Sequence, residues 1–200
     1  MNTTAADYIK GLKAAYYDRD ARAEWDHFEQ IKQGADPEDL RQLAAFYPQA
    51  PQVLFDLLSY ADGTYWREYA GEQIALYFLG SDVEGYPYYL LSAKEMIANE
   101  QLAAQNYGDY IERTYEEVDI DGKITDDKTQ LQWLHFADCM NNGGTSQLFL
   151  DFSPSPEGKA GQVVRFLHDP DELKVIANGF SEYLGLLIAN QYDFIDEELL

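Results

Sequence analysis

Three short apolar segments separated by two turns occupy residues 131–167, and this pattern restricts the fold more than any other part of the chain. The first turn, 137–145, contains an Asn-Gly-Gly sequence, and glycine adopts positive φ without steric cost. The second, 153–159, contains two prolines and a glycine, which interrupt regular structure. The continuous apolar run in 146–152 is typical of a strand covered on both faces. The sequence therefore predicts the centre of an antiparallel sheet, with strands at 131–136, 146–152 and 162–167.

Helical periodicity is found on both sides of these strands. Apolar residues recur every three or four positions in the first thirty residues, with a break near 18–20. A capping box at Ser92 and Glu95 predicts the start of a later helix. Asp169, Pro170 and Glu172 predict the start of the last one. We expect further strands at 74–79 and 88–91, and helices at 5–33, 37–47, 51–61, 93–117 and 170–188.

This order of elements indicates an α+β fold, with a central antiparallel sheet flanked by N-terminal, middle and C-terminal helices. Two hundred residues, 46% of them apolar, are sufficient for a single domain with a sizeable core.

The net charge is extreme, because 36 acidic residues face only 14 Lys and Arg and leave a formal charge of −22. Such a chain is repelled by polyanions, so nucleic acid and anionic membranes are excluded as electrostatic partners. The charge favours a basic protein partner, or serves solubility alone.

Cys139 is the single cysteine of the sequence, which rules out an internal disulfide and a Cys-rich zinc site. The first residues show no basic region followed by an apolar run, so we expect no signal peptide. The apolar runs are too short to span a bilayer. We therefore expect a protein of the cytoplasm that needs no cofactor.

The acidic segment 117–128 resembles a calcium-binding loop in part. Gly122 takes the sixth position, where such loops have glycine. Lys128, however, stands at the twelfth position, where the loop needs a bidentate glutamate, and Glu117 replaces the usual first aspartate. We interpret the segment as an Asp-Gly turn and expect no metal site.

Sequence motifs of catalysis are absent, since neither a nucleophile elbow nor a phosphate-binding glycine loop occurs. The alternative to a non-catalytic protein is a hydrolase that uses Asp138, Asp151 and His135 around the glycines 143–144. Cys139 activated by His135 is a weaker alternative. We expect a protein that is not an enzyme.

Aromatic residues cluster after two of the expected turns. Tyrosine and tryptophan on loops suit protein recognition, because they offer large contact areas at low entropic cost. A tyrosine-rich edge of the core is the other interpretation. Our candidate partner-binding residues are the aromatic anchors Tyr65, Trp66, Tyr86 and Tyr88, with Asp62 and Asp138 as acids at the rim.

The central stretch resembles the SUKH superfamily, and within it the Smi/Knr-type domain. The likeness is strongest in 133–164, where a Trp-x-x-Phe strand precedes an acidic, glycine-rich loop. An apolar strand ending in Asp151 and a Gly-Gln-Val strand at 161–163 follow. His135 stands where the family has proline. Weaker matches extend the resemblance over 36–187, with Asp62 in place of asparagine and Gly179 in place of serine.

The resemblance implies a non-enzymatic α+β domain that binds proteins. Bacterial members are viewed mostly as immunity proteins that neutralise toxins, often nucleases, and fungal members regulate cell-wall synthesis and signalling. We therefore expect a basic toxin domain as the partner, with a cytoplasmic scaffold or regulator as the alternative. The expected organisation is an N-terminal helical extension at 1–35, the Smi/Knr-like domain at 36–190 and an acidic tail at 191–200. The oligomeric state is left open.

Overall fold

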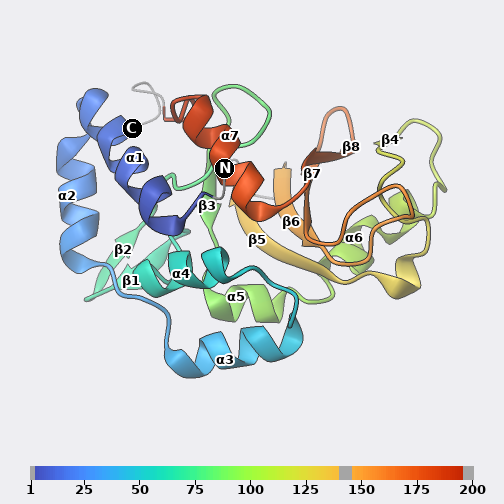
Figure 1. Cartoon of the computed structure of the whole chain (residues 1–200), viewed down its shortest axis with the longest axis horizontal. Coiled ribbons are helices and arrows are strands. Elements are labelled where there is room, and N and C mark those ends of the chain that lie inside the picture. Colours follow the sequence, from blue (N-terminus) through green and yellow to red (C-terminus); the bar gives the residue numbers. More distant parts are fainter. Residues whose placement is uncertain (1–2, 140–145, 196–200) are drawn as a thin grey trace.

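Six strands form the main sheet of the computed structural model, in the spatial order β3-β5-β6-β7-β8-β4 (Figure 1). The structure describes residues 3–139 and 146–195. The glycine pair expected at 143–144 and the last five residues of the acidic tail lie outside this description. The strands are β3 (Tyr88–Leu90), β4 (Asp119–Ile120), β5 (Trp133–Cys139), β6 (Ser146–Asp151), β7 (Gln162–Leu167) and β8 (Glu172–Ala177).

The antiparallel centre predicted from the sequence is confirmed, although its first strand is shifted: β5 begins at Trp133 and continues to Cys139, so residues 137–139 of the predicted first turn belong to the strand. Strand β6 pairs with β5 on one side and with β7 on the other, both antiparallel. The sheet is mixed, because β4 adds to β8 in parallel at the far edge. A second, two-stranded sheet consists of β1 (Arg67–Tyr69) and β2 (Glu72–Ile74).

Seven α-helices surround the sheet within the described residues. The predicted break in the first helical region separates α1 from α2, where Asp20 adopts a positive φ of 55°. Thr4, Asp36 and Ser92 accept hydrogen bonds from backbone N–H groups in the first turns of α1, α3 and α5. The helices are α1 (Ala5–Asp18), α2 (Arg22–Ile31), α3 (Pro37–Phe46), α4 (Gln52–Tyr60), α5 (Ala93–Ala98), α6 (Leu102–Ile111) and α7 (Phe180–Ala189).

Hydrophobic side chains form two clusters, one on each face of the main sheet. The larger cluster joins α1, α2, α4 and α7 to inward-facing strand residues such as Leu134, Leu148 and Val163. The smaller cluster joins Tyr107 of α6 to Phe149 and its neighbours on the opposite face. Figure 1 shows α1 beside α7 and places α6 near the other end of the sheet. The first two helices thus share the main core, while the three segment boundaries stay a prediction.

Three predictions of local structure are wrong. Residues 172–177 form β8, because the backbone of this segment pairs with β7 from Val163 to Leu167. The helix expected at 170–188 therefore begins only at Phe180. The helix expected at 93–117 divides into α5 and α6 between Asn99 and Gln101. The strand expected at 74–79 is reduced to the end of β2 and an isolated bridge from Leu79 to Tyr88.

Leu150 tests the position of the core. Its side chain is fully buried in the larger cluster, together with Leu148, Phe180, Leu184 and Leu187, as the sequence predicted. Replacing Leu150 by alanine is expected to lower the free energy of unfolding by about 2–5 kcal/mol, through lost burial and a residual cavity. Urea denaturation of the two proteins measures this difference. A loss below about 0.5 kcal/mol would contradict the burial of Leu150.

Candidate partner-binding surface

Trp66 has the largest exposed apolar side chain of the candidate residues, with 53% of its surface accessible. It precedes β1, and its φ of 48° lies in the left-handed region that few residues other than glycine adopt. The side-chain amide of Gln73, in β2, donates a hydrogen bond to the carbonyl oxygen of Trp66 at 3.4 Å. The β1–β2 hairpin therefore holds an indole at the surface, where it can contact a partner.

A row of three tyrosines lies beside Trp66. The ring of Tyr65 is 5.0 Å from that of Tyr89, which is 5.3 Å from that of Tyr77. Tyr89 belongs to β3, the edge strand of the main sheet, and pairs with Asp138 of β5. Burial, and next the charge of Asp138, raise the pKa of Tyr65. The row therefore joins the predicted anchor Tyr65 to the predicted acid Asp138.

Asp138 is partly exposed and is held by a short chain of hydrogen bonds. Its carboxylate accepts from the amide of Gln147 at 3.1 Å and from the backbone N–H of Cys139 at 3.0 Å. The hydroxyl of Tyr107 donates in turn to Gln147 at 2.5 Å. Burial raises the pKa of Asp138, against the effect of these hydrogen bonds. The carboxylate is therefore fixed in position at the rim of the tyrosine row.

Two of the predicted residues are buried. Asp62 is only 3% exposed. It accepts a hydrogen bond from the backbone N–H of Ala93 at 2.9 Å and pairs with Arg67 at 2.5 Å. Tyr88 lies in the larger core cluster, where its hydroxyl is 2.5 Å from that of Ser146. Both side chains are therefore covered by other residues and cannot contact a partner directly; they hold neighbouring residues in place instead. Tyr86, half-buried, packs its ring 5.7 Å from that of Tyr88.

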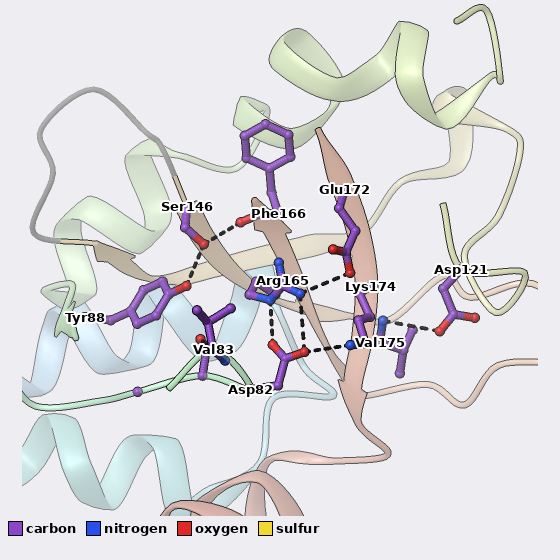
Figure 2. Close-up of polar contacts among 12 residues, drawn as sticks. Asp82, Val83, Tyr88, Asp121, Ser146, Arg165, Phe166, Glu172, Lys174 and Val175 are labelled. Atoms are coloured by element: carbon purple, nitrogen blue, oxygen red, sulfur yellow. Dashed lines mark hydrogen bonds and ion pairs between the residues drawn. The ribbon is translucent and has the colours of Figure 1, made fainter. Parts of the chain in front are cut away.

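An ion network around the buried side chain of Arg165 anchors the loop that carries Tyr86 (Figure 2). Arg165 of β7, only 2% exposed, donates from Nε to the carboxylate of Asp82 at 2.5 Å and from Nη2 to Glu172 at 3.1 Å. Lys174 reaches the same aspartate at 2.9 Å. Burial acts to raise the pKa of Asp82, but the hydrogen bonds from Arg165 and Lys174 outweigh it and lower that pKa. Sequence reasoning missed this network.

Of the three residues of the alternative hydrolase only two come together: Nε2 of His135 lies 3.9 Å from the carboxylate of Asp138, while Asp151 stays apart. Asp138 pairs with Gln147 and Asp151 with Trp133, so the two carboxylates stand at opposite ends of the β5–β6 ladder. His135 is buried, and its burial lowers its pKa to about 3, although a hydrogen bond to Ala137 acts in the other direction. A permanently neutral, enclosed imidazole is poorly suited to general acid–base catalysis near pH 7.

His135 also cannot activate Cys139 in this arrangement. The thiol contributes to the larger cluster, whereas the imidazole stacks on Phe149 of the smaller cluster, on the other face of the sheet.

The acidic segment 117–128 contains a turn centred on Asp121. The carboxylate of Asp121 accepts from the backbone N–H of Lys123 at 2.9 Å, and its carbonyl accepts from that of Ile124 at 3.0 Å. These bonds fit the predicted Asp-Gly turn. In the ranges 3–139 and 146–195, no group of three His, Cys, Asp or Glu side chains is placed to hold a metal ion.

These features define a small α+β domain in which an exposed indole, a tyrosine row and a fixed carboxylate share one edge of the sheet. A scan against protein-family models matches residues 34–185 to the SMI1 / KNR4 family (SUKH-1). The match covers most of the chain, so the chain belongs to this family. The resemblance found in the central strands is thereby confirmed. Domains of this family are typically protein-binding and generally non-catalytic. No curated protein matches the chain.

None of the helices in the described part of the chain has the length and apolar character needed to cross a bilayer.

Proposed function

We propose that this chain is a non-catalytic, cytoplasmic protein-binding module that acts as an immunity protein and neutralises a nuclease-type toxin by direct binding. The observation that carries the proposal is the family match over residues 34–185, because bacterial members of the SUKH superfamily are viewed mostly as immunity proteins. The charge of −22 adds support, since an acidic surface accelerates the approach of a basic nuclease domain.

The binding surface of this proposal centres on Trp66. Tyr65 and Tyr86 extend the aromatic contact area, and Asp138 supplies a carboxylate at the rim. Buried aromatic anchors usually account for most of the binding energy, while rim charges act mainly on the association rate. Asp62 and Tyr88 enter the proposal as supports for these residues, because both are buried.

The test is co-expression with a basic toxin domain encoded next to this gene. We expect direct binding in a pull-down and restored growth of cells that produce the toxin. Binding without protection would favour the alternative, a scaffold or regulator of cell-wall-type signalling. If no neighbouring toxin domain is bound or neutralised, the immunity role is rejected.

Substitution of Trp66 by alanine should weaken binding to such a toxin domain by more than about 1 kcal/mol, because a central indole that becomes buried in an interface is a frequent hot spot. Isothermal titration calorimetry gives the affinity of each variant. Phe46→Ala is the matched control, since Phe46 is similarly exposed, at 51%, but belongs to α3. Equal losses for the two variants would show that the contact is not centred on Trp66.

A further inference from the structure

A second aromatic site lies between α6 and the β7–β8 turn, apart from the surface around Trp66. Tyr110 of α6 and Tyr115 of the following loop form two walls of a cleft of about 440 Å³. Their ring centroids are 5.5 Å apart and their planes are nearly perpendicular, at 79°. Tyr115 is one of the few large aromatic side chains that the described residues leave exposed, at 46%. The exposed ring of Tyr115 therefore offers a π face to a ligand that enters the cleft, while Tyr110, half-buried and stacked on Phe166, forms the second wall.

The positions of both walls are fixed before any ligand binds. The hydroxyl of Tyr110 donates to the carboxylate of Asp171 at 2.7 Å, and His168 binds the other oxygen of that carboxylate. The loop that carries Tyr115 is held by Arg113, whose guanidinium donates to the carbonyl oxygens of Ile124 and Thr125 at 3.0 and 2.9 Å. A preformed site loses less conformational entropy when it binds.

The strand pairing of β4 with β8 brings the acidic lining together. Asp119 lies opposite Glu172 in this parallel pair, and its backbone N–H donates to the carbonyl of Asp171 at 3.2 Å. As a result Glu117, just before β4, lines the same cleft as Asp169 and Asp171 from the β7–β8 turn.

The negative charge of the cleft is only partly compensated by basic side chains among the described residues. Asp109 and Glu112, nearby on the outer side of α6, share an ion pair with Lys128. By contrast, none of the ion pairs among the described residues joins a Lys or Arg to Glu117, Asp169 or Asp171. His168 is the one basic group of the lining. Its hydrogen bond with Asp171 raises its pKa, so a protonated His168 offsets one of the three carboxylates.

We propose that this cleft binds the guanidinium group of an arginine from an exposed segment of a partner protein. Aromatic faces attract cations, and the planar guanidinium both stacks on a ring and pairs with a carboxylate through two N–H donors. The exposed ring of Tyr115 and the carboxylates of Glu117 and Asp169, which form no ion pair with a Lys or Arg of the described residues, match both halves of this recognition. The site would add a second point of contact for a basic partner, and it does not require that the partner be a toxin.

The test uses two short acetylated peptides, Gly-Arg-Gly and the same peptide with citrulline, which has the shape of arginine but no charge. Binding to the full chain is followed by NMR, through the ring signals of Tyr110 and Tyr115. We expect saturable shifts with the arginine peptide and at least about fivefold weaker binding of the citrulline peptide. Equal binding of the two peptides would overturn the proposal.

Two substitutions locate the site. Tyr115→Leu removes a π face from an exposed position, and Asp169→Asn removes one charge without change of size; each should weaken arginine binding about threefold. Asparagine tolerates the left-handed backbone of Asp169, whose φ is 67°. Asp20→Asn is the matched control, because Asp20 is exposed, has a φ of 55° and lies between α1 and α2.

The control should bind like the unchanged protein. If Asp20→Asn weakens binding as much as Asp169→Asn, the attraction is a property of the whole acidic surface and the site is rejected. Unchanged affinity in Tyr115→Leu also rejects it. If the arginine peptide binds the cleft but the protein does not neutralise a toxin, the arginine site is retained and only the immunity role is rejected.

Discussion

Replacement of Arg165 by leucine is expected to lower the free energy of unfolding by about 1–3 kcal/mol, because it leaves two partly exposed carboxylates without their main counter-charge. In the folded protein the guanidinium binds Asp82 through two nitrogens and Glu172 through one. After the substitution only Lys174, which is half-exposed, would still contact Asp82. Denaturant unfolding of the two proteins gives the difference.

An exposed ion pair provides the control for this prediction. Arg41 pairs with Glu38 on α3, and its side chain is largely in solvent. Arg41→Leu should therefore change stability by less than about 1 kcal/mol. Adding Asp82→Asn to Arg165→Leu should recover part of the loss, because it removes a carboxylate left without its partner. If Arg165→Leu is no more damaging than Arg41→Leu, the network does not stabilise the fold.

The Arg165 network also shows which part of the structure the sequence could not predict. A single arginine among the apolar residues of 163–167 gives no sign of its partner, and Asp82 lies 83 positions earlier in the chain. The strand itself was predictable, since 162–167 forms β7 with the expected bounds. Local pattern therefore located the strand, whereas the ion pair depends on how a distant loop packs.

The segment before α7 shows the limit of hydrophobic periodicity. Leu173, Ala177 and Phe180 follow a helical spacing, and an aspartate and a proline precede them as in a capped helix. Leu173 and Ala177 also fit a strand, and Val175 and Ile176 are β-branched, which favours a strand. Residues 172–177 form a strand because their backbone groups hydrogen-bond to the neighbouring strand β7. A tertiary partner of this kind cannot be inferred from a window of ten residues.

The surroundings of individual aromatic residues could not be predicted from the sequence either. Tyr88 and Tyr89 are neighbours in β3 and both are buried, yet Tyr88 enters the larger cluster while Tyr89 contacts Tyr65 and Tyr77. Strand alternation explains this difference once the strand is known. The composition did predict that some of the 16 tyrosines would lie at the surface, and Tyr115 is among them. Which ones do so depends on the register of the sheet.

Stability should fall as the pH decreases below about 6.5, because His135 remains neutral in the folded protein. Its pKa is lowered from 6.5 to about 3, mainly by burial. The unfolded chain therefore takes up a proton in this range before the folded protein does, and proton uptake by the unfolded state favours unfolding. Each pH unit costs about 1.4 kcal/mol, so about 2 kcal/mol should be lost between pH 6.5 and pH 5.

The interval between pH 6.5 and pH 5 is the one in which the pH dependence of stability reports mainly on His135. Burial raises the pKa of Asp138 and of Asp151, so the folded protein binds these protons more readily and part of the loss is offset at lower pH. His168, like these two carboxyl groups, opposes the effect of His135. Its raised pKa contributes stability that is present below the unfolded value and is lost as the pH rises above it. Between pH 6.5 and pH 5 the slope should thus belong mainly to His135.

His135→Gln isolates this contribution. The imidazole Nε2–H donates to the carbonyl of Ala137 at 3.0 Å, so Nδ1 is the acceptor for the amide of Asn99 at 3.0 Å. Glutamine also has one donor and one acceptor group, but it does not titrate. The variant should have a nearly flat stability between pH 6.5 and pH 5, whereas His27→Gln, at an exposed position, should keep the slope of the unchanged protein. A slope that persists in His135→Gln would show that other groups control the acid sensitivity and that His135 is not held neutral by burial.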